Sequence, residues 1–570
     1  MARIKSKRSS VSTLSCKFGG MGKHAPLSPE GADDMCNFRI LPNGTLRVRS
    51  GYTLKKHFAS GETIRGFWEG TIEKIFYCFA VVGNTVYRLI GNAMNERAVG
   101  TVADEDCNVH FFVYENTLYL LDGTNIQCYH MSSGKFETIE PYIPLYGFAW
   151  SPSSWGEINE EINLLTPKLR VQHIRILPNR HSRGEEIRLL LLCCSADGQK
   201  TTDYSFSSGS NKITFPNVPI MVEVGFTFEI NESLRDYLFE SQMAYVHSRD
   251  NIKQLFLWGN NSYLFCAKNV TTEMIESSRV FFPKACNLYF CQDDILFLGD
   301  NTHPITTICP FYETLLAFTS DRIWNLTFDK KAGIVATLSM QDIGCASQKG
   351  AIVYRDGVIA AMKDGVYLIT ASPARPEDLF LERISMGVDD KFSMGFTDKV
   401  HLIRDFAHGE VWIRDPGNSD GEIWVWNTEL KEWYRFDRID TPFFFQKNNE
   451  IGFAHGSDLF LFDRNASTDN GSSINAHYKS AYLDFHSQDV PRRSMRALLC
   501  ASPTKSSTQI LFETEQGEIT WQLTSPAYAT APQLHDMRMP SHRYRFLRFT
   551  LSCNASHPTE YYKLDIYSRP

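Results

Sequence analysis

The chain has 570 residues and a formal net charge of −7. Its length exceeds that of one ordinary core and predicts two to four structural units. Apolar residues make up 43% and charged residues 22%, which excludes a disordered chain, and the net negative charge argues against a protein whose whole surface binds nucleic acid.

Residues 1–50 are expected to form an N-terminal arm and a docking hairpin. Six cations precede the first acidic residue, Glu30. They predict either an arm that contacts phosphate or an acidic neighbour, or a solvated, disordered start. The pair Asn43-Gly44 is a strong two-residue hairpin signal. The cations are Arg3, Lys5, Lys7, Arg8, Lys17 and Lys23.

Three arginines of this hairpin are the candidate binding residues. Arg47 and Arg49 are two residues apart, so on a strand they share one face. Together with Arg39 they suit inter-subunit docking against an acidic neighbour. The alternative is a solvated strand face with no partner.

A short repeat then dominates the chain from residue 51 to residue 486. Each copy is an apolar strand, a turn of Gly, Asn or Asp, and a second strand with an aromatic residue, which predicts a β-hairpin. The aromatic residues fall 32 to 57 apart, apart from one large gap, as expected for four-stranded propeller blades. They are Tyr87, Tyr119, Trp324, Tyr367, Trp424 and Phe460. A β-sandwich array with accidental spacing is the alternative.

The domain prediction follows from these patterns. Blades occupy residues 51–154 and 236–486, and an inserted β-domain at residues 155–235 accounts for the gap. Alternating strands over residues 487–570 predict a C-terminal β-sandwich. The predicted fold class is therefore all-β: a β-propeller of six or seven blades with an inserted β-domain and a C-terminal β-sandwich.

Motifs for catalysis, cofactors and metals are missing from the sequence. The loop Gly19–His24 lacks the first glycine and the Ser or Thr of a phosphate-binding loop. The 14 cysteines include no Cys-x-x-Cys, and the histidines are dispersed. We therefore predict no enzyme activity, no cofactor and no catalytic or metal-binding residue.

The sequence also lacks signals for export or for a membrane. The basic start is not followed by an apolar stretch, so no signal peptide is expected. The longest apolar run, Leu189–Cys194, is too short to span a bilayer. We expect a chain made in a cytoplasm, with no membrane insertion.

Several short motifs in a fixed order resemble those of a known family. Phe18-Gly19-Gly20-Met21 and Leu27–Ala32 come first, followed by Leu41–Tyr52, Glu161–Pro167, Trp258-Gly259-Asn260 and Lys363–Tyr367. The series resembles bacteriophage β-propeller tail proteins of the tail-nozzle, tail-tubular and packaged-DNA-stabilisation type. The resemblance runs over most of residues 15–485.

The resemblance implies a structural virion protein of a bacteriophage tail or head–tail connector, made in the host bacterial cytoplasm. It implies a ring or nozzle of six copies that lines or closes the DNA exit path. Its expected partners are other copies of itself, neighbouring tail or connector proteins, and genomic DNA in transient passage. Two alternatives stay open: a propeller that binds or hydrolyses host-surface glycans, and an intracellular propeller scaffold.

Overall fold

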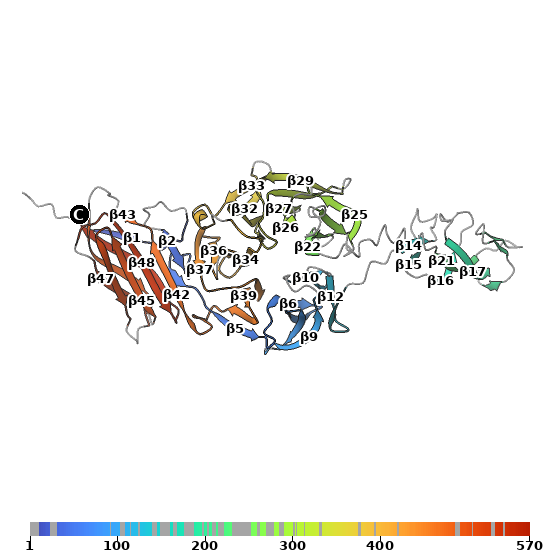
Figure 1. Ribbon diagram of the computed structural model, residues 1–570, viewed down its shortest axis with the longest axis horizontal. Helices are drawn as coiled ribbons and strands as arrows, with labels where there is room; N and C mark the ends of the chain where they lie inside the picture. The colour runs from blue at the N-terminus through green and yellow to red at the C-terminus, as the bar shows by residue number, and fades with distance from the viewer. Residues whose placement is uncertain are drawn as a thin grey trace, which may run out of the picture.

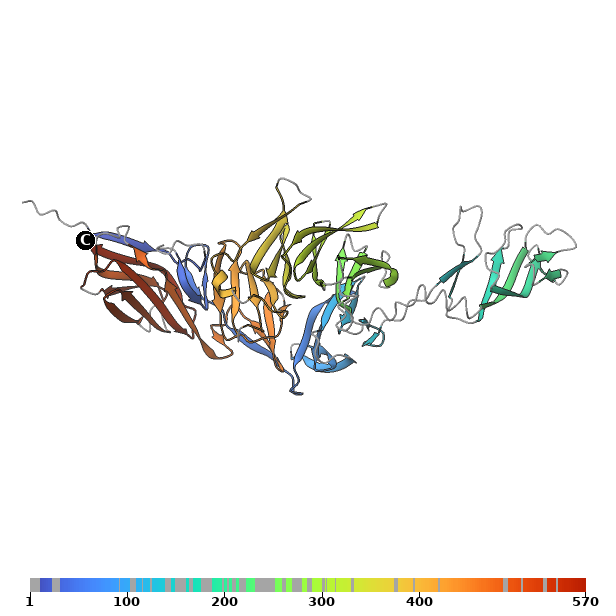
Figure 2. The ribbon, with the colours of Figure 1, turned by 45° about the horizontal axis from the view of Figure 1, so that its top comes forward.

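The computed structural model describes residues 11–22, 31–138 and 290–569, apart from short gaps, and between residues 139 and 289 the strands named below. Strands dominate, and one short 3-10 helix, Asp389–Phe392, is assigned among these residues. A propeller lies beside a β-sandwich, and the C-terminus lies at the end of the sandwich away from the propeller (Figures 1 and 2). Within the described part, no helix is long and apolar enough to cross a membrane.

The propeller has seven blades, each formed by four antiparallel strands. Blade 1 comprises β6 (Ile64–Ile72), β7 (Ile75–Val82), β8 (Thr85–Ile90) and β9 (Asn95–Thr101). Blade 2 comprises β10 (His110–Tyr114), β11 (Thr117–Leu121), β12 (Ile126–His130) and β13 (Lys135–Thr138). Blade 3 comprises β22 (Ile252–Trp258), β23 (Tyr263–Lys268), β24 (Arg279–Pro283) and β25 (Phe290–Phe297).

Blades 4 and 5 comprise β26 (Ile305–Phe311), β27 (Thr314–Thr319), β28 (Arg322–Asp329) and β29 (Gly333–Gln341); and β30 (Ala351–Tyr354), β31 (Gly357–Met362), β32 (Gly365–Ala371) and β33 (Leu379–Arg383). Blades 6 and 7 comprise β34 (His401–Asp405), β35 (Glu410–Arg414), β36 (Ile423–Asn427) and β37 (Glu432–Phe436); and β38 (Phe444–Lys447), β39 (Glu450–His455), β40 (Asp458–Phe462) and β5 (Tyr52–His57).

The blades close around one axis. The first strands of blades 3 to 7 contact one another in order, from β22 through β26, β30 and β34 to β38. Strand β38 contacts β6 of blade 1, β6 contacts β10, and β11 of blade 2 contacts β22. The predicted all-β propeller is therefore confirmed, with seven blades.

Strand β5 closes the ring from the other end of the sequence. It pairs with β40, so blade 7 takes its fourth strand from the N-terminal region. Tyr52 of β5 contacts the rings of Phe453, Phe460 and Phe462 at centroid distances of 4.9, 5.3 and 5.7 Å. These aromatic contacts join the first and last parts of the propeller.

The sandwich combines strands from both ends of the chain. One sheet contains β1 (Ser12–Cys16), β3 (Phe38–Ile40), β4 (Leu46–Val48), β44 (Arg493–Ala501), β47 (Gln533–Arg538) and β49 (Glu560–Arg569). The other contains β2 (Ala32–Cys36), β42 (Ser472–Ser480), β43 (Leu483–Asp484), β45 (Ser507–Thr514), β46 (Gly517–Leu523) and β48 (Phe546–Ala555). Buried residues alternate with partly buried or exposed residues along β48 and β49, because one face of each sheet covers the core.

Strand β2 joins the sandwich to the propeller. It pairs with β42 of the sandwich on one side and with β37 of blade 6 on the other. A single sheet of 11 strands therefore runs from inside the propeller into the sandwich. Gly20 lies beside this junction, where an added Cβ would come within 2.7 Å of the Trp433 carbonyl oxygen. Only glycine allows this approach.

The strands described between residues 145 and 230 pair among themselves. They are β14 (Leu145–Phe148), β15 (Glu160–Asn163), β16 (Lys168–Arg175), β17 (Ile187–Ala196), β18 (Gln199–Thr201), β19 (Ser205–Ser207), β20 (Lys212–Thr214) and β21 (Val222–Ile230). Strand β14 pairs with β15, β16 to β18 form a sheet with β21, and β19 pairs with β20. The predicted insertion at residues 155–235 covers β15 to β21.

Two predicted boundaries differ from the structure. The described strands within residues 1–50, β1 to β4, are not a separate arm with a docking hairpin, because they belong to the sandwich sheets. The sandwich also begins before residue 487, since β42 contributes a long strand to it. The hairpin of β3 and β4 is confirmed, with Gly44 at a φ of +79° in its turn.

We predict that the substitution Tyr52→Ala destabilises the propeller by about 2–4 kcal/mol, because it removes a ring that packs against three others. Tyr52→Phe keeps the ring and should retain most of the stability. Urea unfolding followed by tryptophan fluorescence measures both. Equal stability of the two variants would contradict a closing role for β5.

Candidate functional site

The junction between blade 6 and the sandwich holds a buried polar network. Arg39 of β3 is 4% exposed. Its Nε and Nη2 donate to the two carboxylate oxygens of Glu410 on β35 at 2.8 and 3.1 Å, and Nη2 lies 3.5 Å from Asp405 Oδ2. A two-pronged pair of this kind fixes both position and orientation. Arg39 thus ties a sandwich strand to blade 6.

Two side chains of blade 6 donate further hydrogen bonds to the Glu410 carboxylate. The Tyr434 hydroxyl donates to Oε1 at 2.6 Å, and the Trp412 indole N–H donates to Oε2 at 2.9 Å. Burial raises the pKa of Tyr434 well above its ordinary value, and the charge of Glu410 adds to this. Burial alone would lower the pKa of Arg39, but Glu410 and Asp405 raise it. The arginine therefore stays charged and the tyrosine neutral.

A second buried arginine lies close by, just after β4. Arg49 donates to both carboxylate oxygens of Asp469 at 2.8 and 2.7 Å, and its Nε donates to Asn37 Oδ1 at 2.9 Å. Its guanidinium carbon lies 5.7 Å from the centroid of the Phe436 ring. The guanidinium carbon of Arg39 lies 5.1 Å from the centroid of the same ring. The two arginines thus share one aromatic ring of blade 6.

A third group of charges surrounds β2 itself. Arg435 of β37 donates to both oxygens of Asp34 at 3.0 and 3.1 Å and to Glu422 at 2.7 Å. His477 of β42 lies 2.8 Å from Asp34 Oδ2. Burial would raise the pKa of Asp34, but hydrogen bonds from His477 and Arg435 lower it well below 3.8. This ion pair links the propeller strand to the joining strand.

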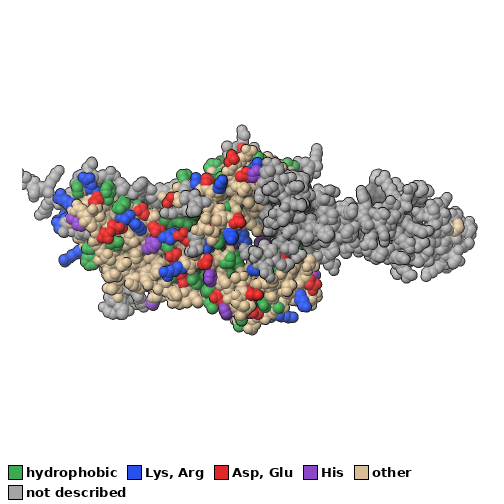
Figure 3. Space-filling model, viewed as in Figure 1, with side chains coloured by type: hydrophobic (Ala, Val, Ile, Leu, Met, Phe, Trp, Pro, Cys, Tyr) green, Lys and Arg blue, Asp and Glu red, His purple; other side chains and the backbone are tan. Residues whose placement is uncertain are grey.

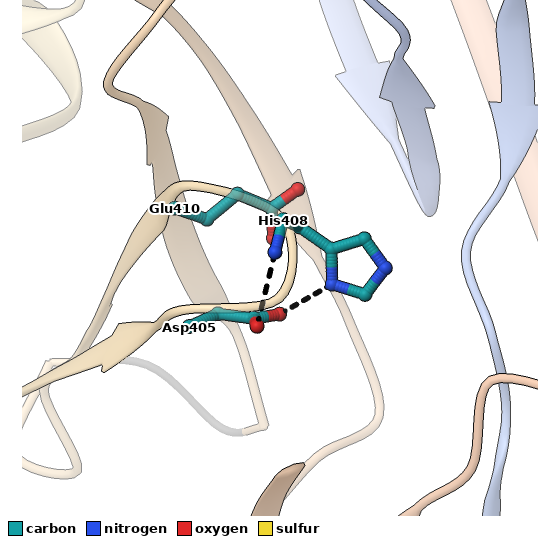
Figure 4. Close-up of side chains that lie close together, drawn as sticks. All are labelled: Asp405, His408 and Glu410. Atoms are coloured by element: carbon teal, nitrogen blue, oxygen red, sulfur yellow. Dashed lines mark hydrogen bonds and ion pairs between the residues drawn. The ribbon is translucent and has the colours of Figure 1, made fainter. Parts of the chain in front are cut away.

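Asp405, His408 and Glu410 are close enough together to suggest a metal site, and Figure 4 shows their side chains on the turn between β34 and β35. Their ligand atoms, however, already have partners. Asp405 Oδ2 lies at hydrogen-bond distance, 2.7 Å, from His408 Nδ1, and Asp405 Oδ1 accepts a hydrogen bond from the backbone N–H of Ala407 at 2.9 Å. The Arg39 guanidinium supplies the positive charge that both carboxylates need, so this trio fits a structural ion pair better than a cation site.

The three arginines proposed from the sequence lie in different surroundings. Arg39 and Arg49 are buried and bind acidic residues of their own chain, so their predicted role in inter-subunit docking is wrong. Arg47 has an exposed side chain and pairs with Glu560 of the neighbouring strand β49. Arg47 and Arg49 do not share an exposed face, because Arg49 follows the end of β4.

Sequence reasoning missed the acidic partners. Glu410 and Asp469 lie 371 and 420 residues from the arginines that they bind. No local spacing connects residues so far apart in the chain. The one available signal was the set of alternating arginines in a strand that also carries buried apolar residues, which is unusual for a solvated face.

A cavity of about 360 Å³ lies between blades 5 and 6. Its walls include the rings of Tyr354, Trp426 and Trp433 together with the charged Glu382 and Lys431. The three rings are nearly buried, and the Trp433 indole N–H donates to the backbone carbonyl of Ile384 at 2.8 Å. These aromatic residues pack the two blades together, which accounts for their presence without a ligand.

Comparisons with known proteins find solved structures of similar fold but do not assign the chain to a family. No protein-family model and no curated protein matches the chain. A chain of the crystal structure of BBS1N in complex with ARL6DN covers 74% of this chain and 99% of its own length, with 8% identity and a TM-score of 0.36. The Cps50 (Swd1) β-propeller domain of Myceliophteria thermophila covers 73% and 97%, with 9% identity and a TM-score of 0.32.

A third similar structure is the exo-β-1,3-galactanase of Phanerochaete chrysosporium with galactose. It covers 55% of this chain and 95% of its own length, with 10% identity and a TM-score of 0.19. Likenesses this low say nothing about activity, substrates or partners. The seven closed blades described above carry the fold assignment.

We predict that Arg39→Ala destabilises the protein by about 3–5 kcal/mol, because it leaves the buried Glu410 without its counter-charge. Arg47→Ala, in the same hairpin, should cost less than about 1 kcal/mol, because its ion pair with Glu560 is partly exposed. Chemical denaturation of both variants measures the difference. Similar losses in the two variants would argue against a central role for the Arg39 pair.

The lowered pKa of Asp34 predicts an acid-sensitive junction. A carboxyl whose folded pKa lies below 3.8 adds stability above pH 3.8 and loses it as the pH falls through the folded value. Asp34→Asn should therefore be less stable than the native chain at pH 7, and the gap should narrow below pH 4. Unfolding curves between pH 7 and pH 2 test this, with the exposed turn variant Asp356→Asn as the control. A constant gap would contradict the prediction.

Proposed function

We propose that this chain is a structural protein of a bacteriophage particle, located in the tail or the head–tail connector, and that it is not an enzyme. Several copies surround the path that DNA takes on leaving the capsid, next to neighbouring tail or connector proteins. The ordered motifs described above support the phage assignment. The geometry supports the mechanical part of the proposal.

One observation carries this proposal: the continuous 11-strand sheet that runs from blade 6 into the sandwich. Two domains connected only by a linker rotate freely, whereas two domains sharing a sheet keep a fixed angle. The buried pairs of Arg39 and Arg49 hold the same junction. A body of this kind transmits load between neighbours, which a ring or nozzle subunit has to do.

The charge of the chain agrees with a passive role toward DNA. Every phosphate contact made by a Lys or Arg adds affinity that depends strongly on salt. A subunit with a net charge of −7 would not hold a moving DNA strand tightly. In the described junction, the carboxylates that come together are neutralised by arginines and do not form an open acid–base pair.

We predict that the chain is present in several copies in purified phage particles. Quantitative mass spectrometry of the particles gives the copy number relative to the capsid protein, and cryo-electron microscopy gives its place. Density for seven-bladed propellers around the DNA exit path is the expected result. Absence from the particles, or turnover of a glycan by the purified chain, would contradict the proposal.

A further inference from the structure

The end of the sandwich away from the propeller carries a concentrated set of arginines. Six exposed arginines come from β44, β47, β49 and the segment before β48. Figure 3 shows Lys and Arg side chains gathered at this end of the molecule. We call the set the arginine patch: Arg493, Arg496, Arg538, Arg543, Arg545 and Arg569.

Strand pairing forces these like charges together. Arg493 lies directly opposite Arg569, and Arg496 lies directly opposite Arg538. Side chains opposite each other on neighbouring strands start about 5 Å apart, and like charges in such pairs destabilise a sheet. Tyr544, which bridges to Arg492, brings Arg543 and Arg545 to the same end. The patch therefore costs stability in the isolated chain.

Little acidic charge offsets the patch within the chain. Arg496 lies 3.5 Å from Asp536, in an exposed ion pair. Glu515 accepts the backbone N–H groups of Arg545 and Phe546. Among the described residues, the other five guanidinium groups have no acidic partner. An unbalanced set of this kind is explained by a negatively charged surface outside the chain.

The residues around the patch indicate a protein surface as its partner. The Arg496 guanidinium carbon lies 4.8 Å from the centroid of the Tyr567 ring, while Met495 and Leu534 are 37% and 64% exposed. Arginine, tyrosine and methionine are the residue types enriched at protein interfaces, where lysine is depleted. A site for the nucleic-acid backbone has no need of an exposed leucine.

The chain itself has the complementary charge. Residues 30–491 contain 42 Lys and Arg against 59 Asp and Glu, so the body outside the two termini is strongly acidic. Ser12 of β1 pairs with Ser568, next to Arg569 of the patch. One molecule therefore presents a basic end and an acidic body.

We propose that the arginine patch binds the acidic body of a second copy of this chain in a head-to-tail contact. Such a heterologous contact repeats from copy to copy, and it produces a ring or a filament according to the rotation between subunits. This inference deepens the proposed function by naming the surface through which copies meet.

The test compares two triple variants with equal changes in charge. The first is Arg493→Gln, Arg538→Gln and Arg569→Gln in the full chain. The control is Lys135→Gln, Lys363→Gln and Lys399→Gln, three exposed lysines of the propeller. Sedimentation velocity over a range of concentrations, at about 50 and 500 mM NaCl, measures self-association.

We expect the native chain to self-associate, with an affinity that falls at high salt. The arginine variant should bind itself at least about tenfold more weakly, while the control stays within about twofold of the native chain. The thermal midpoint of the arginine variant should not fall, because a cross-strand repulsion has been removed. That readout separates loss of contact from loss of folding.

Three results would overturn this inference: a native chain that stays monomeric, equal association of the arginine variant, or patch-dependent binding of a short DNA duplex in place of a second copy. None of them bears on whether the chain is present in phage particles. The particle composition measured above decides the proposed function separately.

Discussion

The whole architecture depends on the pairing of β2 on both of its edges. The five-residue strand β2 pairs along its length with β42 of the sandwich, and its last residue, Cys36, pairs with Arg435 of β37, the outer strand of blade 6. If water replaced the backbone hydrogen bonds of β2, the sandwich would lose a strand and blade 6 would lose its contact with that strand at the same time. The sandwich and the propeller are therefore one mechanical body, and a single hydrophobic cluster runs from blades 5 to 7 into the sandwich.

The charged residues at this junction give orientation more than stability. Removing two charges from water is expensive, and their mutual attraction often returns little more than that cost. What the pair of Arg39 and Glu410 does supply is a single geometry, because its two parallel hydrogen bonds fix both planes. Apolar side chains would hold the same surfaces together with less control over the angle between them.

Sequence patterns predicted the repeated part of the fold well, since each blade is local. A hairpin of alternating apolar residues around a tight turn needs no distant information, so Tyr87 and Trp424 identified their blades directly. Strand β5 lies within the predicted blades, but its pairing with the last blade was missed, as was the place of β1 to β4 in the sandwich, because their partners lie hundreds of residues away. Ser12 hydrogen-bonds to Ser568 across 556 positions, and no periodicity reports such a pairing.

The large separation between partners in the sequence also explains why the candidate site was predicted in the wrong place. An arginine next to buried apolar residues can lie in solvent, in a subunit interface or in an internal ion pair, and the sequence does not choose among them. Arg39 and Arg49 proved internal because acidic groups from blade 6 and from β41 (Thr468–Asp469) reach them. The arginine patch was invisible for a related reason: its members are scattered between residues 493 and 569, and only strand pairing puts like charges side by side.

Joining both chain ends in one sandwich also affects folding. Strands β1 to β4 are made first, but the strands that pair with β1 and β4 come last, so these edges stay open until the chain is nearly complete. Long-range pairings of this kind form slowly, because loop closure costs entropy before contacts compensate it. In return, the described N-terminal strands β1 to β5 are built into the sandwich and the propeller. Loosening β2 or β5 therefore disturbs these units together, which suits a part that must hold its shape.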